Sequence, residues 1–302
     1  MPDMNESAKG TIYATLAVLL FATLGTGFKL SVARLDGYSV AVYMGVFAVL
    51  ALLINLFLTG KARTILPEFR RMPRFFVLTG IIGLGLQQLL CIKSYEHLPA
   101  AQVVILTYSY PLMMIVLARL VYRERSSLRS VGFVLLGFAG VIVLISGGTF
   151  QHIDLSAGVF LSLACAFSFA LFCVLIKHAR FDIGVGMFLF NLSGLLFLLL
   201  LMPFYGFTWQ LTAPQLLVLV YLGVFPTAVA FLLWNRALQL IRTSHSSNFA
   251  LLTPVLSLVF ITLILGEQIV PFQVVGMVII VGAVFLNLNY GDAVAEAERT
   301  HV

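Results

Sequence analysis

Residues 91–111 read CIKSYEHLPAAQVVILTYSYP, and residues 234–254 read WNRALQLIRTSHSSNFALLTP. The two stretches align without a gap at an offset of 143 residues (234 minus 91), and each ends on a proline, Pro111 or Pro254. A proline inside an apolar stretch interrupts a helix in a recognisable way. The pair therefore predicts that the chain contains two copies of one unit.

Chance similarity is the alternative explanation, because any two apolar helices resemble each other. The residues that coincide, however, are mostly of types that are rare in apolar segments. The pairs are Lys93 with Arg236, Pro111 with Pro254 and Glu124 with Glu267 at an offset of 143, and Gly10 with Gly158 and Lys29 with Lys177 at an upstream offset of 148. We therefore favour an internal repeat with a longer connection in the first copy.

The composition indicates a membrane protein. The chain has 302 residues, of which 61% are hydrophobic and 10% are charged. Soluble domains carry about 25% charged residues, so lipid must solvate most of this surface. The net charge of +6 does not indicate a nucleic-acid partner, because the basic residues form short clusters between apolar runs.

The uncharged runs predict ten transmembrane helices. About 20 apolar residues are needed to cross the hydrocarbon core as a helix. The runs are Gly10–Phe28, Gly37–Gly60, Phe75–Ile92, His97–Ala118, Ser130–Ile153, Leu155–Ile176, Ile183–Asn235, Thr243–Gly266 and Gln268–Gly291. The long run Ile183–Asn235 divides into two helices at residues 203–214, which contain turn residues and interfacial aromatics.

Orientation follows from Lys and Arg. If the N-terminus is cytoplasmic, all but Lys29, Arg34 and Lys93 of the 18 basic residues lie inside. Both termini are then cytoplasmic. With an odd number of helices in each copy, the second copy starts from the opposite face. We expect an all-α integral membrane protein of two inverted five-helix repeats, residues 1–150 and 151–302.

Paired interruptions in the two copies predict a site at the midplane of the membrane. Pro111 and Pro254 free backbone carbonyls, which must then face protein or a water-filled cavity. Gly83 and Gly85 stand where the second copy has Pro226. A kink that only assists packing is the alternative for any single proline, and we favour the site for the symmetric set.

Polar and aromatic side chains inside the spans are the candidates to line a cavity. Asn and Gln are costly in hydrocarbon and should face the interior of the bundle, where they can bond polar groups of a substrate. Aromatic rings can hold an apolar or aromatic portion. The candidate substrate-binding residues are Tyr43, Gln88, Tyr108, Asn191, Trp234 and Asn248.

Charged residues lie at helix ends and not within spans. A proton-driven carrier usually holds a buried carboxylate or histidine, so we expect transport without strict proton coupling. Lys29 and Lys177 either snorkel to the interface, which is the simpler interpretation, or attract a carboxylate substrate. Glu124 and Glu267 are predicted to cap the helices that follow, while a role as a gate has no support in the sequence.

The sequence contains no motif typical of an enzyme, an ATPase or a metal site. A Walker-type phosphate loop is absent, so no ATPase is encoded here, and no cofactor is implied. Cys91, Cys165 and Cys173 lie in apolar runs without metal-ligand spacing and are interpreted as packing residues. A membrane enzyme should show clustered catalytic residues, and a channel remains a further alternative.

The motif that follows the second proline resembles a known family. Leu265-Gly266-Glu267, then Gly276 and Gly282, is similar to the EamA repeat of the drug/metabolite transporter superfamily. The first copy departs from the pattern, with Tyr122-Arg123 in place of Leu-Gly before Glu124. The resemblance covers residues 10 to 290.

Within that superfamily, the chain looks most similar to YddG-type exporters. The resemblance implies a central cavity and export of amino acids, aromatic and other neutral ones included, or related metabolites across the bacterial inner membrane by alternating access. Efflux of lipophilic drugs or quaternary ammonium cations is the alternative. It ranks lower because it would favour a carboxylate that faces the cavity, and the first and sixth predicted helices, Gly10–Phe28 and Leu155–Ile176, contain none.

Overall fold

The computed structural model describes residues 6–122, 128–148, 154–177, 179–240 and 243–300, and every regular element in these ranges is helical. The first elements are α1 (Glu6–Ala22), α2 (Leu24–Val32), α3 (Gly37–Leu58), η1 (Ala62–Thr64), α4 (Ile65–Arg71), α5 (Pro73–Gly80), η2 (Ile81–Leu86), α6 (Gln87–His97), α7 (Ala100–Thr107), α8 (Tyr110–Tyr122) and α9 (Leu128–Ile145). They are followed by α10 (Ala157–Ile176), α11 (Ile183–Leu201), η3 (Met202–Phe204), α12 (Ala213–Leu222), η4 (Gly223–Val229), α13 (Ala230–Leu240), α14 (Thr243–Phe260), η5 (Ile261–Leu265) and α15 (Pro271–Thr300).

Seven helical segments of the described chain are long and apolar enough to cross a membrane. They are Ala8–Val32, Gly37–Leu58, Pro73–His97, Ala100–Tyr122, Ala157–Ile176, Ile183–Phe204 and Ala213–Ala237. Three shorter apolar helices, Val131–Ile145, Leu252–Leu265 and Pro271–Asn287, lie beside them. Large apolar side chains such as Leu58 and Leu200 are mostly exposed, as lipid-facing residues are expected to be.

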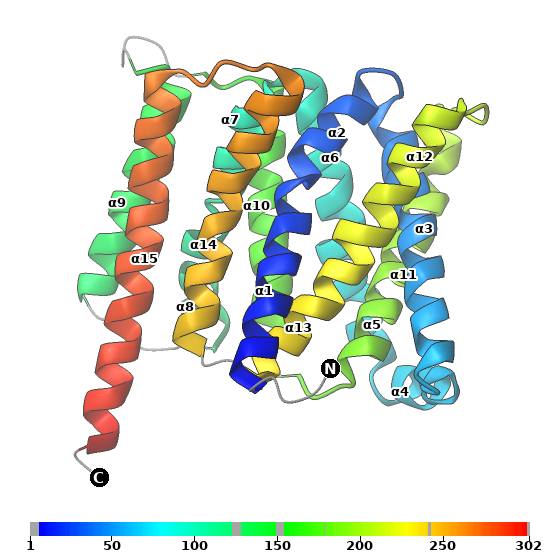
Figure 1. Ribbon diagram of the computed structural model, residues 1–302, viewed down its shortest axis with the longest axis horizontal. Coiled ribbons are helices and arrows are strands. Elements are labelled where there is room, and N and C mark those ends of the chain that lie inside the picture. Colours follow the sequence, from blue (N-terminus) through cyan, green and yellow to red (C-terminus); the bar gives the residue numbers. More distant parts are fainter. Residues whose placement is uncertain (1–5, 123–127, 149–153, 178, 241–242, 301–302) are drawn as a thin grey trace.

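The helices run roughly side by side and are joined by short connections at two ends (Figure 1). The start of α1, the short helix α4 and the end of α15 lie at one end, which we call the N-terminal end. The connections from α2 to α3, from α11 to α12 and from η5 to α15 lie at the opposite end (Figure 1). Helices α9 and α15 pack together at one edge of the bundle.

Several element boundaries differ from those the sequence predicts. The basic connection after α3 contains the helix α4, which we did not expect from its charges. Helix α9 ends at Ile145 and not at residue 153, because Gly147 and Gly148 adopt positive φ angles of 60° and 75°. Helix α7 begins at Ala100 and not at His97, since Pro99 supplies the extended N-cap conformation.

The predicted interruptions take different forms. Gly83 and Gly85 lie in the π-helical η2, and Pro226 lies in the π-helical η4. Pro111 is the second residue of α8, which follows a turn at residues 108–109. Pro254 instead lies inside α14, which continues through it.

Glycines let helices approach closely at two positions related by the 143-residue offset. A Cβ atom added at Gly80 would lie 2.6 Å from the carbonyl oxygen of Phe190 in α11. One added at Gly223 would lie 2.6 Å from the carbonyl oxygen of Met44 in α3. No larger residue fits at either crossing without moving backbone. The crossings fix the positions of η2 and η4 beside the centre of the bundle.

Candidate functional site

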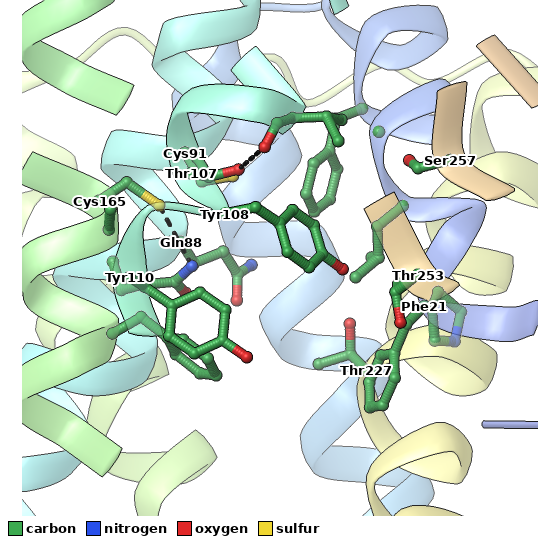
Figure 2. Close-up of a pocket in the computed structure, with 18 of the residues that line it drawn as sticks. Phe21, Gln88, Cys91, Thr107, Tyr108, Tyr110, Cys165, Thr227, Thr253 and Ser257 are labelled. Carbon is green, nitrogen blue, oxygen red and sulfur yellow. Dashed lines mark hydrogen bonds between the residues drawn. The ribbon is translucent and has the colours of Figure 1, made fainter. Parts of the chain in front are cut away.

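A cavity of about 260 Å³ lies at the centre of the bundle. Its walls come from α1, α2, α3, η2, α6, α7, α8, α10, η4, α13 and α14. Figure 2 shows side chains from several of these helices converging on one space. The volume is near the lower end of the roughly 300–1,000 Å³ range of small-molecule pockets, so the cavity suits a small solute.

The cavity is lined by apolar and aromatic groups, and none of the described lining residues carries a charge. Phe21 of α1 contacts Phe231 of α13 with ring centroids 5.0 Å apart in an edge-to-face arrangement. Tyr110 of α8 contacts Phe169 of α10 in the same way at 4.9 Å. Edge-to-face pairs are favourable geometries for aromatic rings, so these four residues form ordered walls.

Polar groups occupy defined places on these walls. The Gln88 Nε2 atom donates to the carbonyl oxygen of Ala41 at 2.8 Å, and Gln88 is 6% exposed. The Gln87 Nε2 atom donates to the Sγ atom of Cys165 at 3.3 Å. Donation by both amide nitrogens fixes the two side chains, so their carbonyl oxygens are the groups left to accept a hydrogen bond.

The break between α7 and α8 directs Tyr108 into the cavity. Tyr108 is the C-cap of α7, and its N–H donates to the carbonyl oxygen of Val104. Its hydroxyl points toward Thr253 of α14, which also lines the cavity (Figure 2). Tyr108 and Thr253 lie in stretches of the sequence that align at an offset of 143 residues.

The structure brings together three of the six residues predicted to bind substrate. Gln88, Tyr108 and Trp234 line the cavity, as does Pro226 among the predicted helix interruptions. Asn248 lies in α14, and its side chain lies outside the described residues.

Two of the predicted residues lie elsewhere. The Tyr43 hydroxyl donates to the carbonyl oxygen of Thr208 at 2.9 Å, at the end of the bundle opposite the N-terminus. The Asn191 Nδ2 atom donates to the carbonyl oxygen of Met187 in its own helix at 2.8 Å, so the helix satisfies that donor. Hydropathy alone does not distinguish such self-satisfied amides from those that face a cavity.

Several residues that line the cavity were not predicted from the sequence. Cys91 and Cys165, interpreted as packing residues, both line the cavity. Thr227 and Thr253 also line it. Each of these two threonines is next in sequence to a proline of the predicted interruptions, and this position could have indicated them.

One end of the cavity is covered. Phe28 of α2 and Tyr95 of α6 meet edge to face at 5.6 Å and are 5% and 3% exposed. Lys29, the next residue after Phe28, donates from Nζ to the carbonyl oxygens of Tyr95 and Leu98 at 2.9 and 2.8 Å. This covered end lies away from the start of α1, because α2 and the end of α6 lie at the far end of the bundle (Figure 1).

The family assignment rests on two matches along the chain. The model of the EamA-like transporter family matches residues 8–146 and again residues 156–289. The chain belongs to the EamA-like transporter family. We call residues 8–146 and 156–289 the first and second segments. Members of this family are transporters and not enzymes, so this EamA-like protein is a multi-pass membrane transporter.

Relatives whose names state a function are distant in sequence but align with most of the transporter. A probable terminal-alkyne amino-acid exporter of Streptantibioticus cattleyicolor is 27% identical over 278 residues, covering 89% of this chain and 91% of the relative. A probable amino-acid metabolite efflux pump of Salmonella typhimurium is 26% identical over 215 residues, covering 67% and 71%. A solved crystal structure superposes with a TM-score of 0.65 at 20% identity, covering 91% of this chain and 94% of that chain, and supports the fold.

Proposed function

We propose that this EamA-like transporter exports neutral amino acids, aromatic ones included, or related metabolites across the bacterial inner membrane. The observation that carries the proposal is the central cavity, which is small and has no charged side chain among its described lining residues. A zwitterion has no net charge and needs no counter-ion from the protein. The names of the relatives from Streptantibioticus and Salmonella agree with amino-acid export.

The proposed architecture is ten transmembrane helices in two inverted five-helix repeats, residues 1–150 and 151–302, with both termini in the cytoplasm. The two family matches and the π-helical η2 and η4, which lie at equivalent positions in the two segments, support the repeat. The basic helix α4, at the N-terminal end with Arg70 and Arg71, supports the orientation. The covered end of the cavity then faces the outside.

The proposed mechanism is alternating access without strict proton coupling. Substrate enters from the cytoplasm, and the half-buried Tyr110, Phe231 and Trp234 receive its apolar portion. Amide and hydroxyl groups of Gln88 and Tyr108 bond its polar groups. With no carboxylate or histidine among the described lining residues, the cavity has no side chain that would titrate during the cycle near neutral pH.

Efflux of lipophilic or quaternary ammonium cations is the second candidate. Its support is the aromatic wall, because the faces of Trp and Tyr rings attract cations. A permanent cation in an uncharged cavity would, however, remain without a balancing carboxylate. We therefore rank efflux of cations below export of zwitterionic amino acids.

The test is efflux of labelled amino acids from proteoliposomes, with and without imposed ion gradients. Neutral amino acids should leave down their gradient at a rate that an imposed pH gradient changes little. Competition by quaternary ammonium compounds and not by neutral amino acids would favour the second candidate instead. Transport that strictly requires a pH gradient would contradict the uncoupled mechanism.

A matched pair of hydroxyl deletions tests the cavity itself. Tyr108→Phe removes a hydroxyl that lies in the cavity, whereas Tyr43→Phe removes one that bonds Thr208 elsewhere. We expect Tyr108→Phe to lower the initial efflux rate about tenfold, the effect of about one lost hydrogen bond, and Tyr43→Phe to leave it nearly unchanged. Equal effects of the two substitutions would contradict the assignment of this cavity as the substrate site.

A further inference from the structure

The connection between α6 and α7 is held at both ends by charged side chains from other parts of the chain. Lys29 of α2 holds the end of α6, and Glu267, which follows η5, holds the start of α7. We propose that Lys29 and Glu267 form the outer gate of this transporter, and that their hydrogen bonds to this connection must break before the cavity opens outward. The inference rests on the proposed alternating-access mechanism.

Lys29 satisfies carbonyls that the end of a helix leaves without partners. The last carbonyl groups of a helix have no intrahelical donor, and Pro99 at the connection has no N–H to offer. The Lys29 Nζ atom donates to the carbonyl oxygens of Tyr95 and Leu98 at 2.9 and 2.8 Å. A cation at a helix C-terminus is favoured by the helix dipole as well. Lys29 therefore makes specific bonds here and does not merely snorkel to the interface.

Glu267 does the same for the start of α7. Pro99 occupies the N-cap position and has no side-chain acceptor to bond the free N–H groups of the first turn. The Glu267 carboxylate accepts from the N–H groups of Ala100 and Ala101 at 3.0 and 3.2 Å. Glu267 lies 167 residues from Ala100 in the sequence, so this cap connects the second segment to the first. The sequence predicted that Glu267 would cap its own following helix, and the structure gives it this partner instead.

These bonds lie directly over the covered end of the cavity. Tyr95, whose carbonyl accepts from Lys29, contacts Phe28 with its ring, and both rings line the cavity. Phe28 and Tyr95 are buried, whereas Phe231 and Trp234 on the same cavity are only half-buried. An aromatic pair therefore blocks this end, and the charged contacts keep its two helices in place.

A gate and a static cap predict different results. Lys29 and Glu267 both lie outside the α6–α7 connection. Helices α6 and α7, which this connection joins, both line the cavity. Separation of the two segments at this end would break the Glu267 bonds without unfolding any helix. A static cap would stabilise the fold and have no effect on the side from which the cavity can be reached.

The native cysteines provide a reporter that needs no substrate. Cys91 and Cys165 line the cavity, and the chain has one other cysteine, Cys173, which Cys173→Ser removes. A small membrane-impermeant methanethiosulfonate reagent is added to the outer face of intact cells. In the Cys173→Ser variant, the thiols of Cys91 and Cys165 should react slowly with the reagent. Lys29→Met and Glu267→Gln should each raise the rate of outside labelling about tenfold, because each removes charge-assisted hydrogen bonds that favour the closed state.

Two controls match these substitutions. Lys93→Met removes a lysine from α6 that pairs with Glu96 of the same helix at 3.1 Å and does not hold the connection. Asp182→Asn removes a carboxylate charge that caps α11 and pairs with Lys61 at 2.6 Å, at the opposite end of the bundle. Neither should change outside labelling. Lys29→Arg keeps a cationic donor and should label close to the parental rate.

The outcomes separate the gate from the proposed function. If Lys29→Met and Glu267→Gln melt at lower temperature but label at the parental rate, the contacts are static caps and the gate is overturned. If outside labelling of these variants rises as expected while the protein does not transport amino acids, the gate is supported and the proposed substrate is wrong. Should Lys29→Met fail to fold, Glu267→Gln alone decides, because glutamine retains an acceptor and the length of the side chain.

Discussion

The two family segments differ most where they reach the cavity. In the first segment, the path from α7 to α8 breaks at Tyr108, and the path from α1 to α2 breaks at Thr23. In the second segment, α10 and α14 run without a break at the equivalent positions. The π-helical η2 and η4, in contrast, lie at equivalent places in both. Because η2 and η4 both reach the cavity wall, the two segments differ there in their helix breaks and not in their π-helical parts.

The glycine crossings are the part of the framework that should be equivalent in the two segments. Gly80→Ala and Gly223→Ala each place a Cβ atom 2.6 Å from a carbonyl oxygen of a neighbouring helix. We expect each to lower the free energy of unfolding by about 3 kcal/mol, the upper part of the range for overpacked cores. Thermal melting of the purified protein in detergent measures this effect.

Two other glycines provide the control for the crossings. Gly132 and Gly282 lie in α9 and α15 with open space around an added Cβ. Alanine at either should be neutral or stabilising by about 0.5–1 kcal/mol, because alanine has the higher helix propensity. If Gly80→Ala strongly lowers the free energy of unfolding and Gly223→Ala does not, the two crossings are not equivalent. The two segments would then differ in their helix packing as well.

The cavity residues should respond unequally. Gln88 and Phe231 occupy equivalent positions at the 143-residue offset, and both line the cavity. Gln88→Leu removes the amide and its bond to Ala41, so we expect initial efflux to fall about tenfold, the effect of one hydrogen bond. Phe231→Leu keeps an apolar wall and should reduce efflux less than about threefold. Equal losses would mean that both segments contribute in the same way to the site.

This contrast explains what the sequence could predict. Hydropathy, the spacing of Pro111 and Pro254 and the clusters of basic residues are one-dimensional signals, and they predicted apolar helices and an internal repeat. They could not show that Asn191 bonds its own helix while Gln88 reaches α3, because that depends on which face each helix turns inward. Polarity identified both residues, and only packing separates them.

Contacts between distant parts of the chain could not be predicted from the sequence either. Glu267 was recognised from its place in the repeat, but its partners at Ala100 and Ala101 are set by the docking of two segments. Its repeat equivalent Glu124 lies outside the described residues. Cys91 and Cys165 come from α6 and α10, and their shared position on the cavity wall has no signature in either helix.

The two prolines give the mildest test of the comparison. Pro111 is the second residue of α8, where an N–H would have no partner within the helix, so Pro111→Ala should leave stability nearly unchanged. Pro254 lies inside α14, so Pro254→Ala restores one backbone hydrogen bond and should stabilise the protein by about 1 kcal/mol. Thermal melting of the two variants measures the difference. If both substitutions stabilise equally, Pro111 is also acting as an interior helix breaker, and the turn at Tyr108 would be imposed by the proline rather than by the packing of the first segment around the cavity.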